Sequence, residues 1–259
     1  MSGARWAIVG QTCADCTMPA DHSTPPLDPA DWLIVALSLV LPTGVTWLYF
    51  IALDDAPAAV QQGVYGIGKA VQFALPVVWV CLVRRQRPTF PRPSAWSLIA
   101  GALFGLAIAA AMIVLYLAAL QPMGLFDEAA CAVRAKVQAF GAGSPARFLL
   151  LAAFYSAIHS LLEEYYWRWF VFGQLARGCK LPAAIAISSI AFAAHHVLVL
   201  GYYFTWLSPL TWLFTLATIV GGAFWAWLYH ASHSLASTWL SHALVDAAIF
   251  AIGYQMIAV

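Results

Sequence analysis

The sequence predicts an all-α protein, a polytopic transmembrane helical bundle of about seven to eight helices. Of its 259 residues, 63% are hydrophobic and only 9% are charged. Soluble domains carry about 25% charged residues, so this chain lacks the charge needed for a surface that faces water. The apolar residues also occur in runs of roughly 20, the length that crosses about 30 Å of hydrocarbon.

The first 30 residues differ from the rest of the chain. Residues 1–30 are polar and contain prolines, and they lack the basic start and apolar core of a signal peptide. We expect a disordered N-terminal tail, followed by a single integral membrane domain over 31–259. Cys13 and Cys16 form a CxxC pair with only His22 nearby, so we expect no metal or redox site in this tail.

Seven apolar segments define the expected membrane spans. They lie near 31–53, 64–83, 95–120, 146–171, 182–200, 208–228 and 236–257. The segment 121–145 carries several charged residues, so we expect an interfacial helix or an ordered loop there. An alternative count of eight spans would split 146–177 or make 121–145 a span. No internal repeat suggests the paired halves of a transporter.

Basic residues in the short loops predict the orientation of the chain. Those residues are Arg84, Arg85, Arg87 and Arg92 after the second span, and Arg177 and Lys180 after the fourth. Both loops fall on the same side if the spans alternate, and the positive-inside rule makes that side cytoplasmic. The N-terminus is then cytoplasmic as well. The net charge of +1 argues against a nucleic-acid partner, because no face could neutralise many phosphates.

A run of charged residues inside the fourth span is the first candidate for function. The segment Glu163-Glu164-Tyr165-Tyr166-Trp167-Arg168 holds three charges, and each costs about 2.5–3.5 kcal/mol at the centre of a membrane helix. Glu164 and Arg168, four residues apart, share a helix face and can pair. Glu163 is rotated by about 100° and is expected to stay unpaired and face a cavity, although His159 lies four residues earlier. The alternative is a buried structural ion network.

Histidines in two later spans add to this run. His195 and His196 follow Phe192 in the fifth span, and because adjacent residues point about 100° apart, at most one should face the same site as Glu163. A histidine in lipid needs a partner, so a hydrogen bond to a neighbouring helix is the alternative.

In the last span, His242 and Asp246 are four residues apart. Asp246 can therefore orient the His242 ring or present its own group beside it. A pair that only locks helices together is the alternative. His230 and His233 are expected in the turn before this span, at the membrane interface.

Together these side chains supply one free carboxylate and two imidazoles within membrane helices. Such a set can activate a water, because a carboxylate accepts the proton, a histidine orients the water and a further group stabilises the oxyanion. A zinc-dependent mechanism is the alternative, because two histidines and one glutamate form a known set of catalytic zinc ligands. The His-Glu-x-x-His motif of soluble metalloproteases is absent.

The glutamate pair followed by arginine, the Phe-x-x-x-His and the His-x-x-x-Asp resemble, in this order, the motifs of the CPBP family. That family includes CAAX prenyl endopeptidases and bacterial proteins of bacteriocin processing and immunity, also called Abi proteins. The resemblance covers roughly 145–250 and includes every motif. It implies an α-helical intramembrane protease of about eight helices that depends on glutamate, without a metal cofactor.

The resemblance also implies roles for individual residues. Glu163 would activate the water and His196 would help to position it. His242 and the residue four positions later would form the oxyanion site, with Glu164 and Arg168 supporting the arrangement. The family commonly has asparagine where this chain has Asp246, and an ionised aspartate has no hydrogen to donate. Asp246 is therefore either protonated, or it only orients His242 while the oxyanion donor lies elsewhere.

The expected function is an intramembrane endopeptidase of a bacterial inner (plasma) membrane. Its partners would be the lipid bilayer and a peptide or protein substrate that is lipidated or anchored near its C-terminus. Two other functions remain open. One is a non-catalytic immunity or scaffold protein of the same fold, and the other is a proton-coupled transporter that uses intramembrane glutamate and histidine as a relay.

Overall fold

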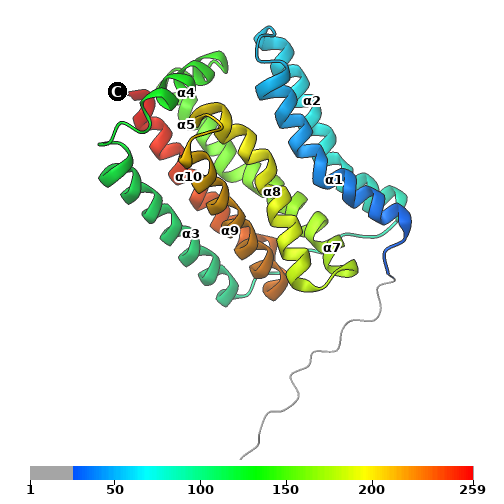
Figure 1. Ribbon diagram of the computed structural model, residues 1–259. Helices are drawn as coiled ribbons and strands as arrows, with labels where there is room; N and C mark the ends of the chain where they lie inside the picture. Colours follow the sequence, from blue (N-terminus) through cyan, green and yellow to red (C-terminus); the bar gives the residue numbers. More distant parts are fainter. Residues whose placement is uncertain (1–25, 259) are drawn as a thin grey trace, which may run out of the picture.

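The computed structural model describes residues 26–258, with the side chain of the last of these left out. The predicted tail, with its CxxC pair, therefore lies almost wholly outside the described residues. Within them, all regular structure is helical and there is no strand. The predicted all-α class is thus confirmed, and the helices form a bundle (Figure 1).

In the described part of the chain, seven helices are long and apolar enough to cross a membrane, and each coincides with a predicted span. The first three spans each end in a short π-helix: α1 Pro29–Trp47 with η1 Leu48–Ala52, α2 Ala58–Val77 with η2 Val78–Val83, and α3 Ala95–Leu115 with η3 Tyr116–Leu120. The fourth is a composite of α5 Pro145–Ala153, η4 Phe154–His159, α6 Ser160–Glu164, η5 Tyr165–Phe172 and α7 Gly173–Gly178. The last three are α8 Leu181–Phe204, α9 Pro209–Ser232 and α10 Leu235–Ala258. The chain is an integral membrane protein.

Several boundaries differ from the prediction. The second span begins at Ala58 rather than near residue 64, because the Gln61 amide nitrogen donates to the carbonyls of Asp54 and Ala56 at 2.8 and 3.0 Å. These bonds satisfy the preceding turn and let a polar first turn stay helical. The sixth span, α9, runs to Ser232 and so includes His230, which was expected in a turn.

The segment between the third and fourth spans contains the short helix α4, Asp127–Ala139, so the first of the two alternatives, a helix, is met, and its position at the membrane interface stays a prediction. Its Lys136 lies 3.5 Å from the Asp54 carboxylate and faces the rings of Tyr49 and Tyr202 at 4.9 and 5.0 Å. Residues 145–178 form one continuous composite helix, so the fourth span is not split into two. The helix α4 is too short to cross a membrane, so 121–145 is not an eighth span.

Small residues let α3 lie directly against α10, as Figure 1 shows. A side chain added at Gly101 would collide with the backbone oxygen of Ser237, and one at Gly105 would come within 2.8 Å of the Ser241 oxygen. The Ser237 hydroxyl also donates to the Ser97 hydroxyl at 2.8 Å. Such close approaches supply packing between helices in lipid, where burial from water contributes little.

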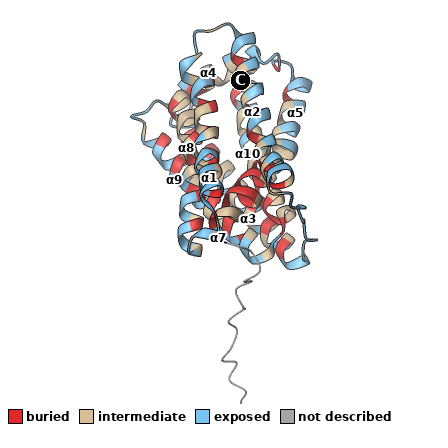
Figure 2. Ribbon diagram, turned by 90° about the vertical axis from the view of Figure 1, so that its right-hand side faces the viewer, coloured by how far each residue is buried: buried red, intermediate tan, exposed pale blue. Residues whose placement is uncertain are grey.

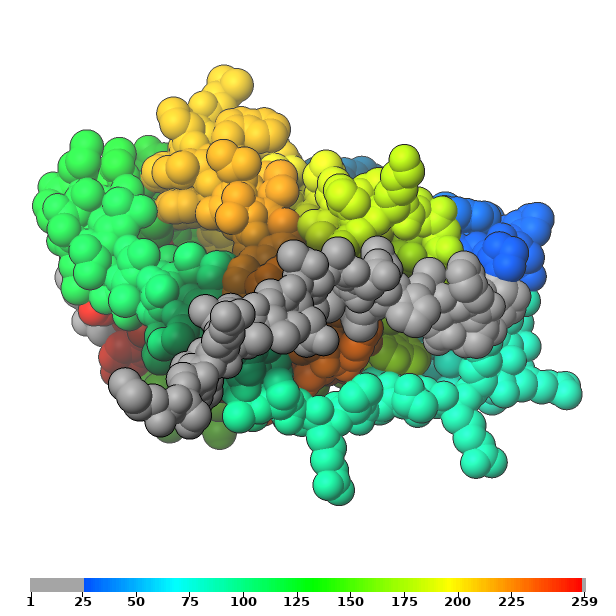
Figure 3. Space-filling view, turned by 90° about the horizontal axis from the view of Figure 1, so that it is seen from below, coloured from blue at the N-terminus to red at the C-terminus, as the bar shows by residue number. Residues whose placement is uncertain are grey.

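The predicted basic loops lie at one end of the bundle. Arg84 pairs with Asp28 and Asp31 at 2.6 and 2.8 Å, and Gly178 lies against Trp32, so the second and fourth spans end beside the start of the first. Figure 3 shows this end, with the turquoise segment after α2 and the yellow-green turn after α7 on one face. The side of the membrane that this end faces stays a prediction.

The main core lies around the composite fourth span. Tyr166, Trp167, Phe170 and Phe172 are each at most 2% exposed and pack with Phe192 and Trp225 of α8 and α9. Figure 2 shows the buried residues gathered most densely in the half of the bundle that contains α7. The charged motif is thus built into the best-packed part of the molecule.

Candidate functional site

The two motif glutamates lie on a short α-helical turn between two π-helical stretches. Glu163 and Glu164 end α6, with η4 before them and η5 after them. A π-helix widens the turn and is often found at functional sites, although η1, η2 and η3 show that this chain also has π-helices elsewhere. This local geometry places two adjacent carboxylates in the protein interior, with exposures of 4% and 0%.

Glu164 is the centre of a buried ion set. Its Oε1 lies 3.3 Å from Arg168 Nη1 and 2.8 Å from His242 Nδ1. The predicted pairing of Glu164 with Arg168 is confirmed, whereas the contact with His242, 78 residues away, was not predicted. Arg168 is itself only 2% exposed, and its guanidinium lies over the rings of Phe192 and Trp225 at 4.6 and 5.1 Å.

Glu163 lies among three histidines from three spans. Its Oε1 is 3.3 Å from His159 Nε2 and 3.6 Å from His195 Nε2, and its Oε2 is 3.9 Å from His242 Nε2. The expectation of an unpaired glutamate is therefore wrong, although the predicted contact with His159 is confirmed. The physical reason is that histidines on α8 and α10 reach the carboxylate across helix interfaces.

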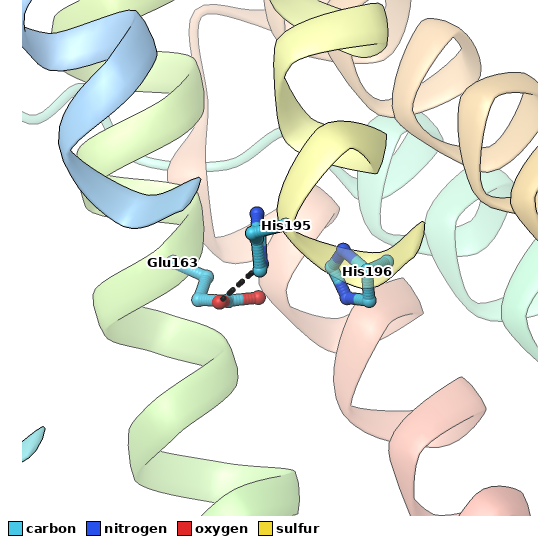
Figure 4. A group of neighbouring side chains, drawn as sticks. All are labelled: Glu163, His195 and His196. Atoms are coloured by element: carbon cyan, nitrogen blue, oxygen red, sulfur yellow. Dashed lines mark ion pairs between the residues drawn. The ribbon is translucent and has the colours of Figure 1, made fainter. Parts of the chain in front are cut away.

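Both α8 histidines face this site. One ligand atom each of Glu163, His195 and His196 lies within 4.8 Å of the other two, and Figure 4 shows the three side chains converging. We call them the donor triad. The expectation that at most one histidine would share the site is wrong, because the two ring centroids are only 4.1 Å apart despite their angular separation. The triad is a set of ligand types that could hold a metal ion.

The two α8 rings are held in different ways. His195 is 5% exposed and lies parallel to the Trp167 ring, with its Nδ1 lacking a hydrogen-bond partner among the described residues. His196 is less buried, and its Nδ1 lies 2.9 Å from the Phe192 carbonyl oxygen. A carbonyl only accepts, so His196 Nδ1 carries the hydrogen and Nε2 keeps its lone pair for the site.

The His242 ring is fixed from several sides. It stacks on Trp225 with centroids 4.3 Å apart, and the Trp225 indole N–H donates to the Ser241 hydroxyl at 2.9 Å. The predicted proximity to Asp246 is confirmed, with 3.7 Å between His242 Nε2 and Asp246 Oδ1. Asp246 keeps 18% of its side chain exposed and is the most accessible acid of the cluster.

The prediction missed a group of polar residues on and beside α2. The Lys69 ammonium lies 5.5 Å from the centre of the Phe73 ring, and Phe73 packs edge-on against His159 with centroids 6.0 Å apart. The Tyr155 ring packs against His159 with centroids 4.9 Å apart. A lysine in an otherwise apolar span was the available sign of this group. His230 and His233, in contrast, lie at the end of α9 near Phe172 and take no part in the described ion pairs.

These features define a class of protein: a polytopic helical membrane protein with a buried carboxylate–imidazole centre. Residues 145–248 match the family model described as type II CAAX prenyl endopeptidase Rce1-like. This segment carries all three motifs, and its similarity to the family model agrees with the resemblance to the CPBP family. The comparisons with curated proteins and with solved structures gave no match.

Proposed function

We propose that this protein is an intramembrane endopeptidase that hydrolyses a peptide bond of a membrane-associated or lipidated substrate. The family match supports a CAAX-protease-like peptidase at the level of the family. The observation that carries the proposal for this chain is Glu163, a buried carboxylate with imidazoles from three spans around it. The bilayer and a peptide are then its partners.

In the proposed reaction, Glu163 accepts a proton from a water while the water oxygen attacks the carbonyl carbon of the scissile bond. His196 and His195 hold that water by their ring nitrogens. His242 Nε2 stabilises the negative oxygen of the tetrahedral intermediate. Glu163 then returns the proton to the leaving nitrogen, the C–N bond breaks, and the products are a new carboxyl group and a new amine.

Glu164 and Arg168 support this chemistry without touching the reacting atoms. Glu164 holds His242 by Nδ1 and so leaves Nε2 directed toward Glu163. Arg168 balances the charge of Glu164, because both groups are removed from water. Asp246 borders His242 Nε2 at 3.7 Å, where its carboxylate would favour a proton on that nitrogen.

The substrate reaches the site laterally from the bilayer in our proposal. An apolar groove of about 450 Å³ lies between α1 and α8. Its lining includes Val40 of α1 and Ala194 of α8, and Ala194 directly precedes His195. The groove's apolar lining suits a lipid chain or an apolar peptide segment.

The test is peptide cleavage by the purified protein in liposomes. Candidate substrates come from comparing membrane-protein C-termini in cells with and without the protein. General-base catalysis contributes about 10²–10⁴-fold, so Glu163→Gln should lower kcat by that factor while the protein stays folded. Glu128→Gln, a change at an exposed residue of α4, is the matched control and should keep full activity. Full cleavage by Glu163→Gln would refute the proposal. Some membrane proteins would accumulate uncleaved in cells that lack this protein. If the purified wild type does not cleave them, the scaffold function is favoured.

A further inference from the structure

The loop between the second and third spans, residues 84–94, is strongly basic. It contains no acid, and it lies outside 145–248, the segment that matches the family model. Its arginines are Arg84, Arg85, Arg87 and Arg92. Three prolines disfavour a helix here, because proline has no backbone N–H to donate. The loop therefore joins η2 to α3 as a non-helical segment.

The loop follows the outer edge of the bundle. Its two neighbours, α2 and α3, lie on opposite sides of the bundle, so the chain has to pass around the helices between them (Figure 1). At the start of the loop the Gln86 N–H donates to the Val80 carbonyl at 2.9 Å and Arg85 has a φ of 53°, so the chain turns sharply after η2. Figure 3, seen from this end, shows side chains of the turquoise segment projecting away from the body of the protein. The loop thus reaches sideways, to where lipid headgroups surround a spanning bundle.

Only one of the four arginines has an acidic partner. Arg84 pairs with Asp28 and Asp31 at 2.6 and 2.8 Å, and these two are the acids that the described residues place at this end of the bundle. The other three arginines are exposed and make no ion pair or hydrogen bond within residues 26–258. They are Arg85, Arg87 and Arg92. The loop therefore presents three positive charges without compensation.

Exposed aromatic rings accompany these charges. Phe90 is 56% exposed, and its ring lies 5.6 Å from the ring of Trp169 in η5. Trp96, in the first turn of α3, is 55% exposed. Aromatic rings of this kind are enriched at the border between hydrocarbon and headgroups. The loop therefore combines cations that suit a phosphate with apolar rings that suit the acyl chains beside it.

We propose that the loop 84–94 binds the headgroups of anionic phospholipids. A lipid fits both features, because its phosphate meets the arginines while its chains contact Phe90 and Trp96. A small anion in water would use the charges alone. Each arginine near a negatively charged membrane surface contributes about fivefold in affinity. This inference concerns a lipid surface and does not depend on the proposed peptidase activity.

The experiment measures lipid bound to the purified full-length chain by native mass spectrometry in mild detergent. Phosphatidylglycerol and phosphatidylcholine are added in equal amounts, since both carry a phosphate but only the first has a net negative charge. The wild type should retain phosphatidylglycerol at least about tenfold more strongly. The triple variant Arg85→Gln/Arg87→Gln/Arg92→Gln should lose most of this preference. The variant with lysine at the same three positions should keep most of it, because it keeps the charge.

Arg147→Gln is the matched control for a single substitution. Arg147 is an exposed arginine at the opposite end of the bundle, where it donates to the Gly141 carbonyl at 3.2 Å. It should leave the ratio of the two lipids unchanged, whereas Arg87→Gln alone should lower that ratio about fivefold.

Three results would overturn the inference. The first is equal binding of the two lipids by the wild type, and the second is a preference that survives the triple glutamine variant. The third is displacement of phosphatidylglycerol by an equal concentration of soluble glycerol phosphate. That result would show a site for a free phosphate in place of a surface for lipid.

Discussion

The two adjacent glutamates should respond very differently to the same substitution. Glu164→Gln removes the counter-charge of Arg168, which is 2% exposed, and weakens the 2.8 Å contact with His242. Breaking a buried pair by removing one partner costs about 3–5 kcal/mol, because the remaining charge is buried without compensation. Glu163→Gln leaves that pair intact and alters only contacts of 3.3–3.9 Å. Its cost should be no more than about 1–3 kcal/mol.

The free energy of unfolding is measured in mild detergent by tryptophan fluorescence, and the cleavage assay is run on the same variants. Glu164→Gln should lower stability by about 3–5 kcal/mol, and the double variant Glu164→Gln/Arg168→Met should recover part of that loss because no unpaired charge remains. Glu163→Gln should lose activity with much less loss of stability. Equal destabilisation by the two single variants would refute the division between a structural and a catalytic glutamate.

Three further outcomes follow from other parts of the molecule. We expect purified protein to contain no stoichiometric zinc and to retain cleavage after strong chelation. One zinc per chain at the donor triad, together with loss of cleavage on chelation, would contradict a glutamate-dependent mechanism. The hydrogen bond from Arg84 lowers the pKa of Asp28 below its usual value of 3.8. The contact therefore stabilises the fold above pH 3.8, and this stabilisation is lost as the pH falls through the pKa of Asp28 in the folded protein. An NMR titration of the Asp28 carboxyl group should show the lowered midpoint, and Arg84→Met should raise that midpoint. Gly101→Ala should cost about 1–3 kcal/mol by forcing α3 away from α10, whereas Gly44→Ala, which has open space, should be neutral or slightly stabilising in an unfolding assay.

Most of the fold could be predicted because lipid imposes a simple rule. Each span must satisfy its own backbone within about 20 apolar residues, so seven apolar runs predict seven helices. The errors arose where local bonds override composition. Gln61 caps the preceding turn and extends α2 toward its N-terminus. The π-helical stretches η4 and η5 within the fourth span have no apolar spacing that distinguishes them from an α-helix.

The site was predictable only where partners share a helix. The pairs Glu164–Arg168 and His242–Asp246 follow from a spacing of four residues, and the structure contains both. The contact between His242 and Glu164 depends instead on how α10 packs against α6, and no spacing encodes that. Lys69 stood out by its charge in an apolar span, but its proximity to His159 through Phe73 depends on how the spans pack.

The contacts of His242 limit where protons can lie in the site. Nδ1 is 2.8 Å from Glu164, which has only acceptor oxygens when ionised, so Nδ1 carries a hydrogen. Nε2 then faces Glu163 at 3.9 Å and Asp246 at 3.7 Å. Both distances exceed a hydrogen bond, so neither fixes a proton, but two nearby carboxylates favour a proton on Nε2. A proton on Nε2 would make His242 an imidazolium that donates to an oxyanion, and Asp246 would then help to keep it charged rather than orient it, because Glu164 already fixes the ring. In our proposal an aspartate can therefore stand where the family commonly has asparagine, because the ring would be the donor to the oxyanion and the residue four positions later would not.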